Sequence, residues 1–215
     1  MSKTHRPGPM AAILARGPVL PVLVIDDLAA AVPLARALYA GGIDTLEVTL
    51  RTTVALDAVR AIRDAVPEVM VGVGSVSTLD QFADALRADA AFAVSPGSTP
   101  ELLEAADYNP MPLLPGATTP TEIMAFIERG TLELKFFPAE LAGGARYLEA
   151  LSGPLPQVSF CPTGGINAVT AASYLALDNV LCVGGSWVAP ADAVATRDWA
   201  RISKLAEAAT QLRKR

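Results

Sequence analysis

Eight short apolar runs alternate with stretches of helical periodicity along most of this 215-residue chain. The runs with strand character are Val19–Ile25, Thr45–Thr49, Met70–Gly74, Phe92–Ser95, Pro112–Leu114, Glu133–Phe137, Val158–Thr163 and Val180–Gly184. The helical stretches are Leu28–Ala40, Val54–Val66, Leu79–Ala88, Pro100–Ala106, Pro120–Glu128, Arg146–Leu151, Val169–Leu177 and Asp198–Leu212. This alternation predicts an α/β fold, a parallel (β/α)8 (TIM) barrel, with an open doubly wound sheet as the main competitor.

The length and composition predict one domain spanning residues 1–215. Barrels of about 200 to 250 residues form around a single core, and no low-complexity or linker segment divides the chain. Hydrophobic residues make up 52% and charged residues 18%, which is enough apolar surface for a compact fold. We expect residues 1–9 to be a flexible tail and Met10–Arg16 to form a short helix across the bottom of the barrel.

Charge and hydropathy exclude several classes of protein. A formal net charge of −5 argues against nucleic-acid binding, which needs clustered Lys and Arg. No apolar stretch of about eighteen residues predicts a membrane span, and no signal-peptide segment follows the basic residues of the N-terminus. A cytoplasmic protein is expected.

Lys135 stands inside the apolar run ELKFFPAE, residues 133–140. Burial disfavours the charged form of an amine, and a neutral amine is a nucleophile toward ketones. The position therefore predicts Schiff-base chemistry. The alternative is a lysine that reaches solvent at the strand end or pairs with Glu133 or Glu140.

Polar and glycine-rich segments follow the predicted strands, at the end where barrel enzymes place their chemistry. They are EVTLRT (47–52), VGVGS (71–75), SPGST (95–99), LPGATTP (114–120), KFFPAE (135–140), CPTGGI (161–166) and VGGSWV (183–188). Strand alternation puts Glu47, Thr49 and Arg51 on one side of their strand. These groups are expected to converge on Lys135. Alternatively, Glu47 and Arg51 only form a pair at the rim, and Ser75 or Thr163 only cap helices.

Two glycine turns predict a phosphorylated substrate. Gly164-Gly165 and Gly184-Gly185-Ser186 follow the last two strands, where barrels often bind phosphate through backbone N–H groups. The competing interpretation is that the glycines only permit tight turns. Because VGVG lacks the third glycine of a dinucleotide fingerprint, no NAD site and no other cofactor is expected.

Histidine and cysteine usage restricts the chemistry further. The only histidine is His5, so the sequence predicts no His-ligated metal and leaves proton transfer to Glu47 or water. Cys161 and Cys182 lie in apolar runs without metal-binding spacing, and we interpret both as buried thiols.

EVTLRT, SPG, KFFPAE, CPTGGI and VGGSWV, in this order and followed by a closing helix, resemble the 2-keto-3-deoxy-6-phosphogluconate (KDPG) aldolases, many of which also act on 4-hydroxy-2-oxoglutarate. The resemblance runs from about Val19 to Leu205. It implies a class I aldolase on a barrel, assembled as a homotrimer, in the Entner–Doudoroff pathway. Its partners would be a keto-acid phosphate and pyruvate.

The resemblance also implies roles for individual residues. Lys135 would form the Schiff base, Glu47 would be the general acid and base, and Arg51 would hold the pyruvoyl carboxylate. Other substrate contacts would come from Ser75, where the family often has threonine, Pro96, Thr163, which would influence aldehyde stereochemistry, and the phosphate contacts Gly164, Gly165 and Ser186, with Gly185 in the same turn.

The expected reaction converts KDPG to pyruvate and glyceraldehyde 3-phosphate, and 4-hydroxy-2-oxoglutarate to pyruvate and glyoxylate. Three alternatives stay open. They are a phosphogalactonate-specific aldolase of the same family, a phosphate-binding barrel isomerase or epimerase, and a catalytically silent barrel that serves as a binding module.

Overall fold

The structure, a computed structural model, describes residues 8–212 of the chain. Within them, nine short strands alternate with ten helices. The strands are β1 (Val19–Leu23), β2 (Thr45–Thr49), β3 (Met70–Gly74), β4 (Ala93–Val94), β5 (Leu113–Leu114), β6 (Gly116–Ala117), β7 (Glu133–Phe136), β8 (Ser159–Pro162) and β9 (Val183–Gly185).

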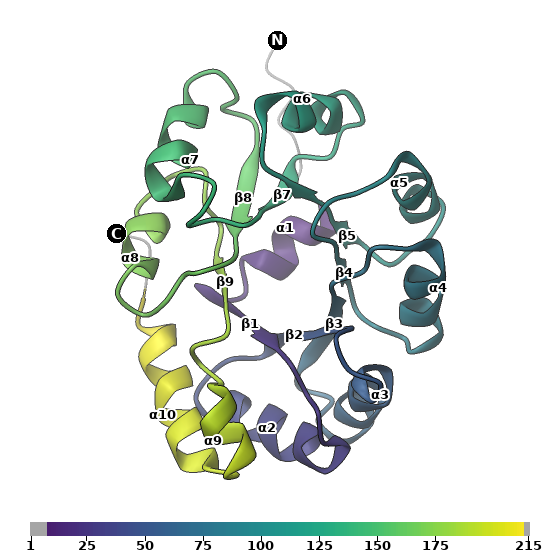
Figure 1. The fold of residues 1–215 in the computed structure, drawn as a ribbon, viewed down its shortest axis with the longest axis vertical. Helices are drawn as coiled ribbons and strands as arrows, with labels where there is room; N and C mark the ends of the chain where they lie inside the picture. Colours follow the sequence, from purple (N-terminus) through teal and green to yellow (C-terminus); the bar gives the residue numbers. More distant parts are fainter. Residues whose placement is uncertain (1–7, 213–215) are drawn as a thin grey trace.

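The strands form two parallel sheets. The larger sheet has the order β5-β4-β3-β2-β1-β9 and the smaller one β6-β7-β8. The last strand lies beside the first, with Val19 opposite Val183. Viewed down the shortest axis of the molecule, the strands are arranged around a ring (Figure 1).

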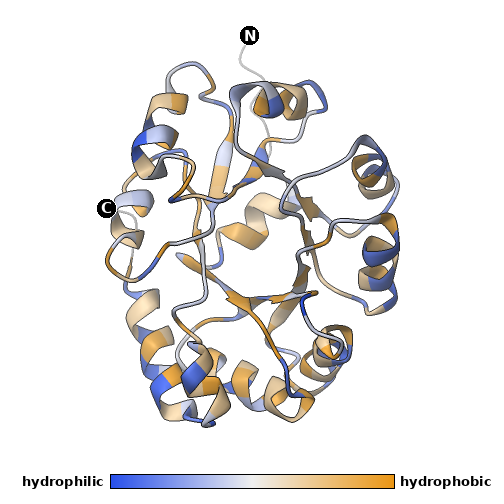
Figure 2. Cartoon of the chain, in the orientation of Figure 1, coloured by the Kyte–Doolittle hydropathy of each residue, from blue (hydrophilic) through white to orange (hydrophobic). Residues whose placement is uncertain are grey.

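Helices surround this ring of strands (Figure 1). They are α2 (Leu28–Ala40), α3 (Ala55–Ala65), α4 (Leu79–Arg87), α5 (Pro100–Asp107), α6 (Pro120–Glu128), α7 (Gly144–Ser152), α8 (Ala171–Leu175), α9 (Ala191–Ala195) and α10 (Trp199–Thr210). In Figure 2 the central strands are largely orange, and blue residues occur mainly on the surrounding helices and loops. None of the described helices is long and apolar enough to cross a membrane.

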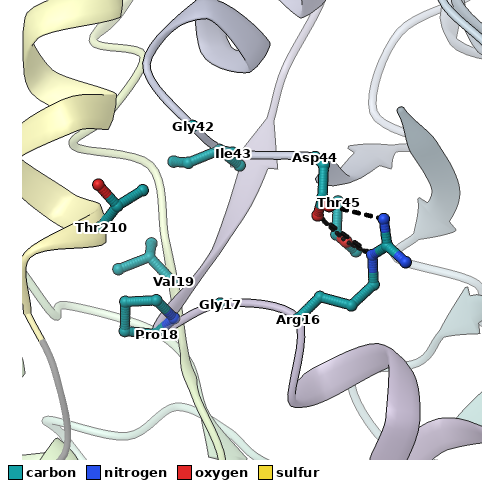
Figure 3. Close-up of a pocket in the computed structure, with 9 residues that line it drawn as sticks. All are labelled: Arg16, Gly17, Pro18, Val19, Gly42, Ile43, Asp44, Thr45 and Thr210. Carbon is teal, nitrogen blue, oxygen red and sulfur yellow. Dashed lines mark hydrogen bonds and ion pairs between the residues drawn. The ribbon is translucent and has the colours of Figure 1, made fainter. Parts of the chain in front are cut away.

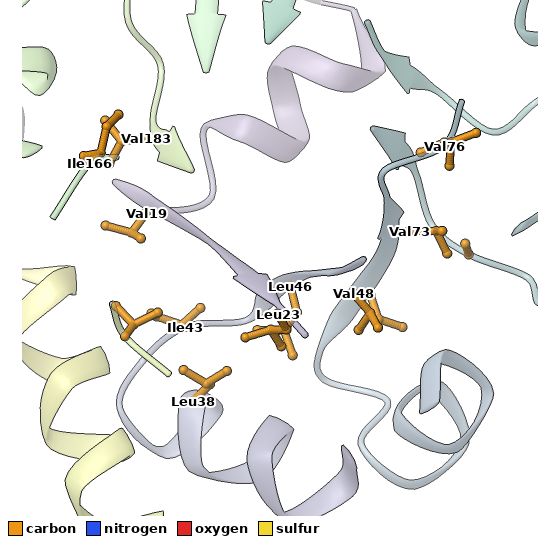
Figure 4. Packing of buried hydrophobic residues seen from close by; sticks show 14 of the residues in the cluster. Val19, Leu23, Leu38, Ile43, Leu46, Val48, Val73, Val76, Ile166 and Val183 are labelled. Atoms are coloured by element: carbon orange, nitrogen blue, oxygen red, sulfur yellow. The ribbon is translucent and has the colours of Figure 1, made fainter. Parts of the chain in front are cut away.

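The main core lies between the strands and the helices. Figure 4 shows Leu23 of β1 and Leu46 of β2 near Leu38 of α2, with Val73 of β3 farther along the same cluster. β-branched and leucine side chains dominate here because one face of each short strand must be covered by a helix. Every residue of β2 is buried, as expected for a strand that has neighbours on both edges and layers on both faces.

The tenth helix, α1 (Pro9–Leu14), has a different place. Its apolar residues Met10, Ile13 and Leu14 join a second cluster with Leu20, Phe92, Val94, Leu114, Cys161 and Cys182. These partners come from both sheets, so α1 covers the interior side of the strands. The predicted N-terminal helix is confirmed. Both cysteines are buried, with their sulfur atoms 3.6 Å apart.

The predicted tail of residues 1–9 was too long. Pro9 is already the first residue of α1, a position where the missing N–H and fixed φ of proline suit a helix. Residues 1–7, including His5, lie outside the described part of the chain.

The predicted α/β fold is confirmed, and the strands are parallel. The predicted eight strands do not form one continuous sheet in this structure. Pro115, which has no N–H to donate, separates β5 from β6. Between β8 and β9 the pairing is reduced to two isolated parallel bridges, Phe160 with Val180 and Thr163 with Gly184.

Candidate active site

Lys135 and Glu47 face each other across the two sheets. Lys135 comes from β7 and is 5% exposed, while Glu47 comes from β2 and is 1% exposed. The Nζ atom of Lys135 lies 3.7 Å from Oε1 of Glu47 and 5.2 Å from the centre of the Phe137 ring. Lys135 therefore does not reach solvent, and Glu47 is its ion-pair partner, not Glu133 or Glu140.

The residues beside Lys135 leave room for its side chain. In the sheet register it lies between Gly116 and Cys161, which have no side chain and a small one. Its backbone N–H donates to the carbonyl of Pro115. Proline thus interrupts the fifth strand, yet its carbonyl still anchors β7.

Hydroxyl groups at the end of β2 hold that strand against β1. Thr49 Oγ1 donates to the carbonyl of Leu23 over 2.8 Å, and Thr52 Oγ1 donates to the carbonyl of Ile25 over 2.6 Å. Thr49 shares the side of Glu47 by alternation, but its hydroxyl is already used in the backbone contact. Its role is therefore to position the strand.

Arg51 and Ser75 meet at the rim, just beyond β2 and β3. Arg51 is exposed, and its Nε donates to Ser75 Oγ over 3.3 Å. Ser75 has a φ of 61°, a left-handed conformation that is uncommon for residues other than glycine. Within residues 8–212, Arg51 forms no ion pair shorter than 4.0 Å, and Glu47 is paired with Lys135, so the alternative of a rim pair between Glu47 and Arg51 is not observed.

Thr163 and the two following glycines lie beyond β8. Thr163 is 7% exposed and is bridged to Gly184. Gly164 and Gly165 have φ values of 106° and 81°, which alone would favour glycine. Their segment is tied to the loop after β7, because Ala139 N donates to the Thr163 carbonyl.

The remaining predicted contacts lie around the same rim. Pro96 is exposed and follows β4, and its carbonyl lies against Gly116, the register neighbour of Lys135. Gly185 is buried at the end of β9, and Ser186 is exposed directly after it. All ten predicted site residues therefore lie on or just beyond the strands of the two sheets, and Lys135 and Glu47 are in direct contact range.

Two contacts escaped the sequence reasoning. Phe137 was predicted as the last residue of the strand that carries Lys135 but was given no role, although its ring contacts the amine. Tyr174 was not considered. Its hydroxyl donates to Glu140 over 2.6 Å. Burial, and to a smaller extent this carboxylate, raises the pKa of Tyr174. The partnership takes Glu140 away from Lys135.

A separate pocket lies at the opposite ends of the strands (Figure 3). There Arg16 forms a two-pronged contact with Asp44, with atom separations of 3.1 and 2.6 Å, and also donates to Thr45. The contact joins the turn after α1 to the start of β2.

Within the described residues, no group of three or more His, Cys, Asp or Glu side chains could hold a metal ion.

Comparisons with known proteins identify the family. Residues 10–205 match the family model for KDPG and KHG aldolase. The KHG/KDPG aldolase of Escherichia coli K12 is 52% identical over 199 residues, 93% of each chain. The 2-dehydro-3-deoxy-phosphogluconate aldolase of Pseudoalteromonas atlantica is 50% identical over 197 residues, 92% of each chain.

A solved structure agrees with these relatives. The KDPG aldolase of Legionella pneumophila, with pyruvate captured as a covalent carbinolamine intermediate, superposes with a TM-score of 0.91 at 48% identity, covering 93% of this chain and 97% of that one. Because the family model matches most of its length and the relatives are 50% and 52% identical to it, this chain belongs to the KDPG and KHG aldolase family and is an aldolase, a carbon–carbon lyase.

Proposed function

We propose that this aldolase cleaves KDPG to pyruvate and glyceraldehyde 3-phosphate through a Schiff base at Lys135, and 4-hydroxy-2-oxoglutarate to pyruvate and glyoxylate. The observation that carries the proposal is the buried amine of Lys135, 3.7 Å from the carboxylate of Glu47. The names of the relatives, KHG/KDPG aldolase and KDPG aldolase, support this choice of substrates.

In the first half of the reaction, neutral Lys135 attacks the C2 ketone of the substrate. The carbinolamine loses water and becomes a protonated imine, which withdraws electrons from the C3–C4 bond. The covalent pyruvate carbinolamine in the Legionella enzyme supports this kind of intermediate.

In the second half, Glu47 removes the proton of the C4 hydroxyl, directly or through one water, as the C3–C4 bond breaks. The electron pair of that bond passes into the imine and leaves an enamine on Lys135, while the aldehyde departs. The enamine is then protonated at C3 and hydrolysed, which releases pyruvate and restores the amine.

Arg51 is proposed to bind the carboxylate of the keto acid, with Ser75 supporting it. Its guanidinium has no ion pair within the described residues and is oriented by Ser75 Oγ. Guanidinium groups bind carboxylates in a two-pronged geometry. Pro96 is proposed to line the pocket beside Lys135, from its place against Gly116.

The phosphate is proposed to lie over the turns after β8 and β9, near Gly164, Gly165, Gly185 and Ser186. Loops in these positions commonly bind phosphate in barrel enzymes. Thr163 directly precedes one of these turns, is buried and is bridged to Gly184 beside the other, which supports its proposed contact with the aldehyde part of the substrate.

We also propose that the two sheets are arcs of one closed eight-stranded barrel. In this view, β5 and β6 are one strand interrupted at Pro115, and the bridges of Phe160 and Thr163 close the ring to β9. A single domain, a homotrimer, a cytoplasmic location and a place in the Entner–Doudoroff pathway are proposed from the family resemblance. Sedimentation equilibrium of the purified protein tests the trimer.

The covalent intermediate is tested by mass spectrometry after incubation with pyruvate and borohydride. The peptide containing Lys135 should gain the mass of one pyruvate, less one water and plus two hydrogens. A Lys135→Ala variant should gain nothing, whereas Lys204→Ala, which changes an exposed lysine of α10, should behave as wild type. An unmodified wild-type peptide contradicts the mechanism.

Steady-state rates with KDPG, its galactonate epimer and 4-hydroxy-2-oxoglutarate determine the preferred substrate. A dominant rate with the galactonate epimer would support the phosphogalactonate-specific alternative. An isomerase or epimerase is not favoured, because the named relatives are aldolases.

A further inference from the structure

Gly74 occupies the end of β3, beside β2, and is paired with Thr49 in the sheet. A Cβ atom built on Gly74 would lie 1.9 Å from Oε1 of Glu47 and 2.6 Å from its Cδ and Cγ atoms. Real Cβ atoms essentially never approach other atoms within 3.0 Å. The side chain of Glu47 therefore fills the space that a side chain at position 74 would need.

The backbone conformation gives no other reason for glycine at this position. Gly74 is an ordinary strand residue, absent from the glycines with positive φ, whereas Gly164 and Gly165 are among them. Alanine would fit the strand conformation, so the constraint is one of space alone.

Glu47 has little freedom to avoid such a Cβ. It is 1% exposed, with the Lys135 amine 3.7 Å away. The strand that carries Gly74 is also held, because β2 and β3 are paired over all five residues and Leu50 N donates to the Gly74 carbonyl over 2.9 Å. To restore an ordinary contact of at least 3.4 Å, the carboxylate itself would have to move.

We propose that Gly74 is a positioning residue for aldol cleavage, and that the absence of a side chain at this position holds the Glu47 carboxylate beside the Lys135 amine. The inference rests on the proposed function, in which these two groups perform the chemistry. Gly74 touches neither the substrate nor the amine and acts only through Glu47.

Gly72 provides a matched control on the same strand. It is buried as Gly74 is, and a Cβ there would meet the ring of Phe92 at 2.5 Å. Gly72 is the register partner of Glu47, yet the atoms nearest to a Cβ at position 72 belong to the apolar ring of Phe92 and not to the carboxylate. Gly72→Ala therefore introduces a methyl group into β3 whose closest contact is with Phe92, whereas that of Gly74→Ala is with Glu47.

The first experiment compares kcat and pyruvate trapping in the purified variants. Gly74→Ala should lower kcat for KDPG about 10²- to 10⁴-fold, the range of a lost general acid or base, while borohydride still traps pyruvate on Lys135. Gly72→Ala should lower the thermal unfolding midpoint and keep kcat near wild type. Wild-type kcat in Gly74→Ala, loss of trapping in it, or an equal loss of kcat in both variants would overturn the proposal.

The second experiment tests the contact itself. In a Glu47→Ala background the clashing Cγ, Cδ and Oε1 atoms are absent, so adding Gly74→Ala should lower the residual kcat far less than it does in wild type. An equal factor in both backgrounds would overturn the proposal.

If the Gly74→Ala protein does not fold, a comparison of thermal stability tests the proposal in place of kcat. Glu47→Ala removes the clashing atoms, so the double variant Glu47→Ala/Gly74→Ala should fold. Adding Gly74→Ala to Glu47→Ala should lower the thermal unfolding midpoint less than adding it to the wild-type protein does. Equal losses would overturn the proposal. Failure of the wild-type protein to trap pyruvate would instead contradict the proposed function, because this stability comparison does not depend on catalysis.

Discussion

Oε1 of Glu47 is buried and has no hydrogen-bond donor within the described residues. The Lys135 amine, at 3.7 Å, is close enough for an ion pair but too distant for a hydrogen bond. A buried polar group without a partner costs about 1–3 kcal/mol or more, and a fold has no structural reason to bear this cost. An unpartnered Oε1 at this position is explained chemically by the proposed mechanism, in which the oxygen takes up a proton during the reaction.

Replacing Glu47 with glutamine tests this role at the scale of one residue. The substitution keeps the size of the side chain but removes the base, so kcat should fall about 10²- to 10⁴-fold while the imine with pyruvate still forms. Stopped-assay kinetics and borohydride trapping measure the two effects separately. Glu140→Gln changes a nearby carboxylate that is bonded to Tyr174 and should leave kcat close to wild type. An unchanged kcat in Glu47→Gln would remove this residue from the mechanism.

The sequence predicted that Glu47 would lie close to Lys135, as the structure shows, but it did not predict the surroundings of the two side chains. Lys135 was recognisable because a charged side chain inside an apolar run is rare, and Glu47 because parallel strand ends gather at one rim. The need for glycine at position 74 was not recognisable, because it arises from the side chain of a neighbouring strand. The pairing of Arg51 with Ser75 likewise depends on the left-handed backbone of Ser75.

Among the elements, α6 shows how local signals determine a helix. Thr119 Oγ1 accepts the N–H of Glu122, and the Glu122 carboxylate accepts the N–H groups of Thr119 and Thr118 at 2.7 and 2.8 Å. Pro120 occupies the first turn. This reciprocal cap is visible in the sequence as T-P-T-E, and the predicted range, Pro120–Glu128, agrees with the structure.

Glu122 should make the stability of the protein depend on pH. The N–H of Thr119, and then that of Thr118, hold the pKa of Glu122 below its ordinary value. The stabilisation is therefore present above the unfolded pKa of about 4.3 and is lost as the pH falls through the lower folded pKa. Glu122→Ala should lower the free energy of unfolding at pH 7 by about 0.5–1.5 kcal/mol.

Denaturant unfolding of wild type and Glu122→Ala at pH 7 and pH 3 checks this expectation. The difference between the two proteins should shrink at the lower pH. Glu128→Ala, at the other end of α6, should show no comparable change. A difference for Glu122→Ala that is the same at both pH values would contradict the role of the charge.

Elements without such signals were predicted less accurately. The five-residue helix α9 was missed because it is too short to show apolar periodicity. Helix α7 begins two residues before the predicted start because Gly143, with a φ of 112°, ends the preceding loop early. The two-residue strands β5 and β6 reflect the missing N–H of Pro115, which the predicted strand Pro112–Leu114 did not reach.

At the scale of the whole molecule, the last elements of the chain pack on the first. Helix α10 lies against α2, and Ser203 Oγ donates to the Ala37 carbonyl over 2.8 Å. Gly41, at the end of α2, permits this close approach. A Cβ there would lie 2.4 Å from the Ser203 carbonyl oxygen and 2.5 Å from Cβ of Ala206.

Gly41→Ala should therefore separate α10 from α2. We expect a loss of about 1–3 kcal/mol in the free energy of unfolding, the usual cost of overpacking, measured by denaturant titration. Gly153→Ala is the matched control, since its Cβ would meet nothing within 4 Å and its φ is −67°. It should be neutral or stabilising by about 0.4–1 kcal/mol. Equal stability of both variants would contradict this account of the helix contact.

The pairing of β1 with β9 has a consequence for biosynthesis. The edge of β1 that receives residues 183–185 lacks this partner until those residues have left the ribosome. A bare strand edge is a template on which another nascent chain can add. The edge of β1 therefore stays open to such addition until residues 183–185 emerge and pair with it.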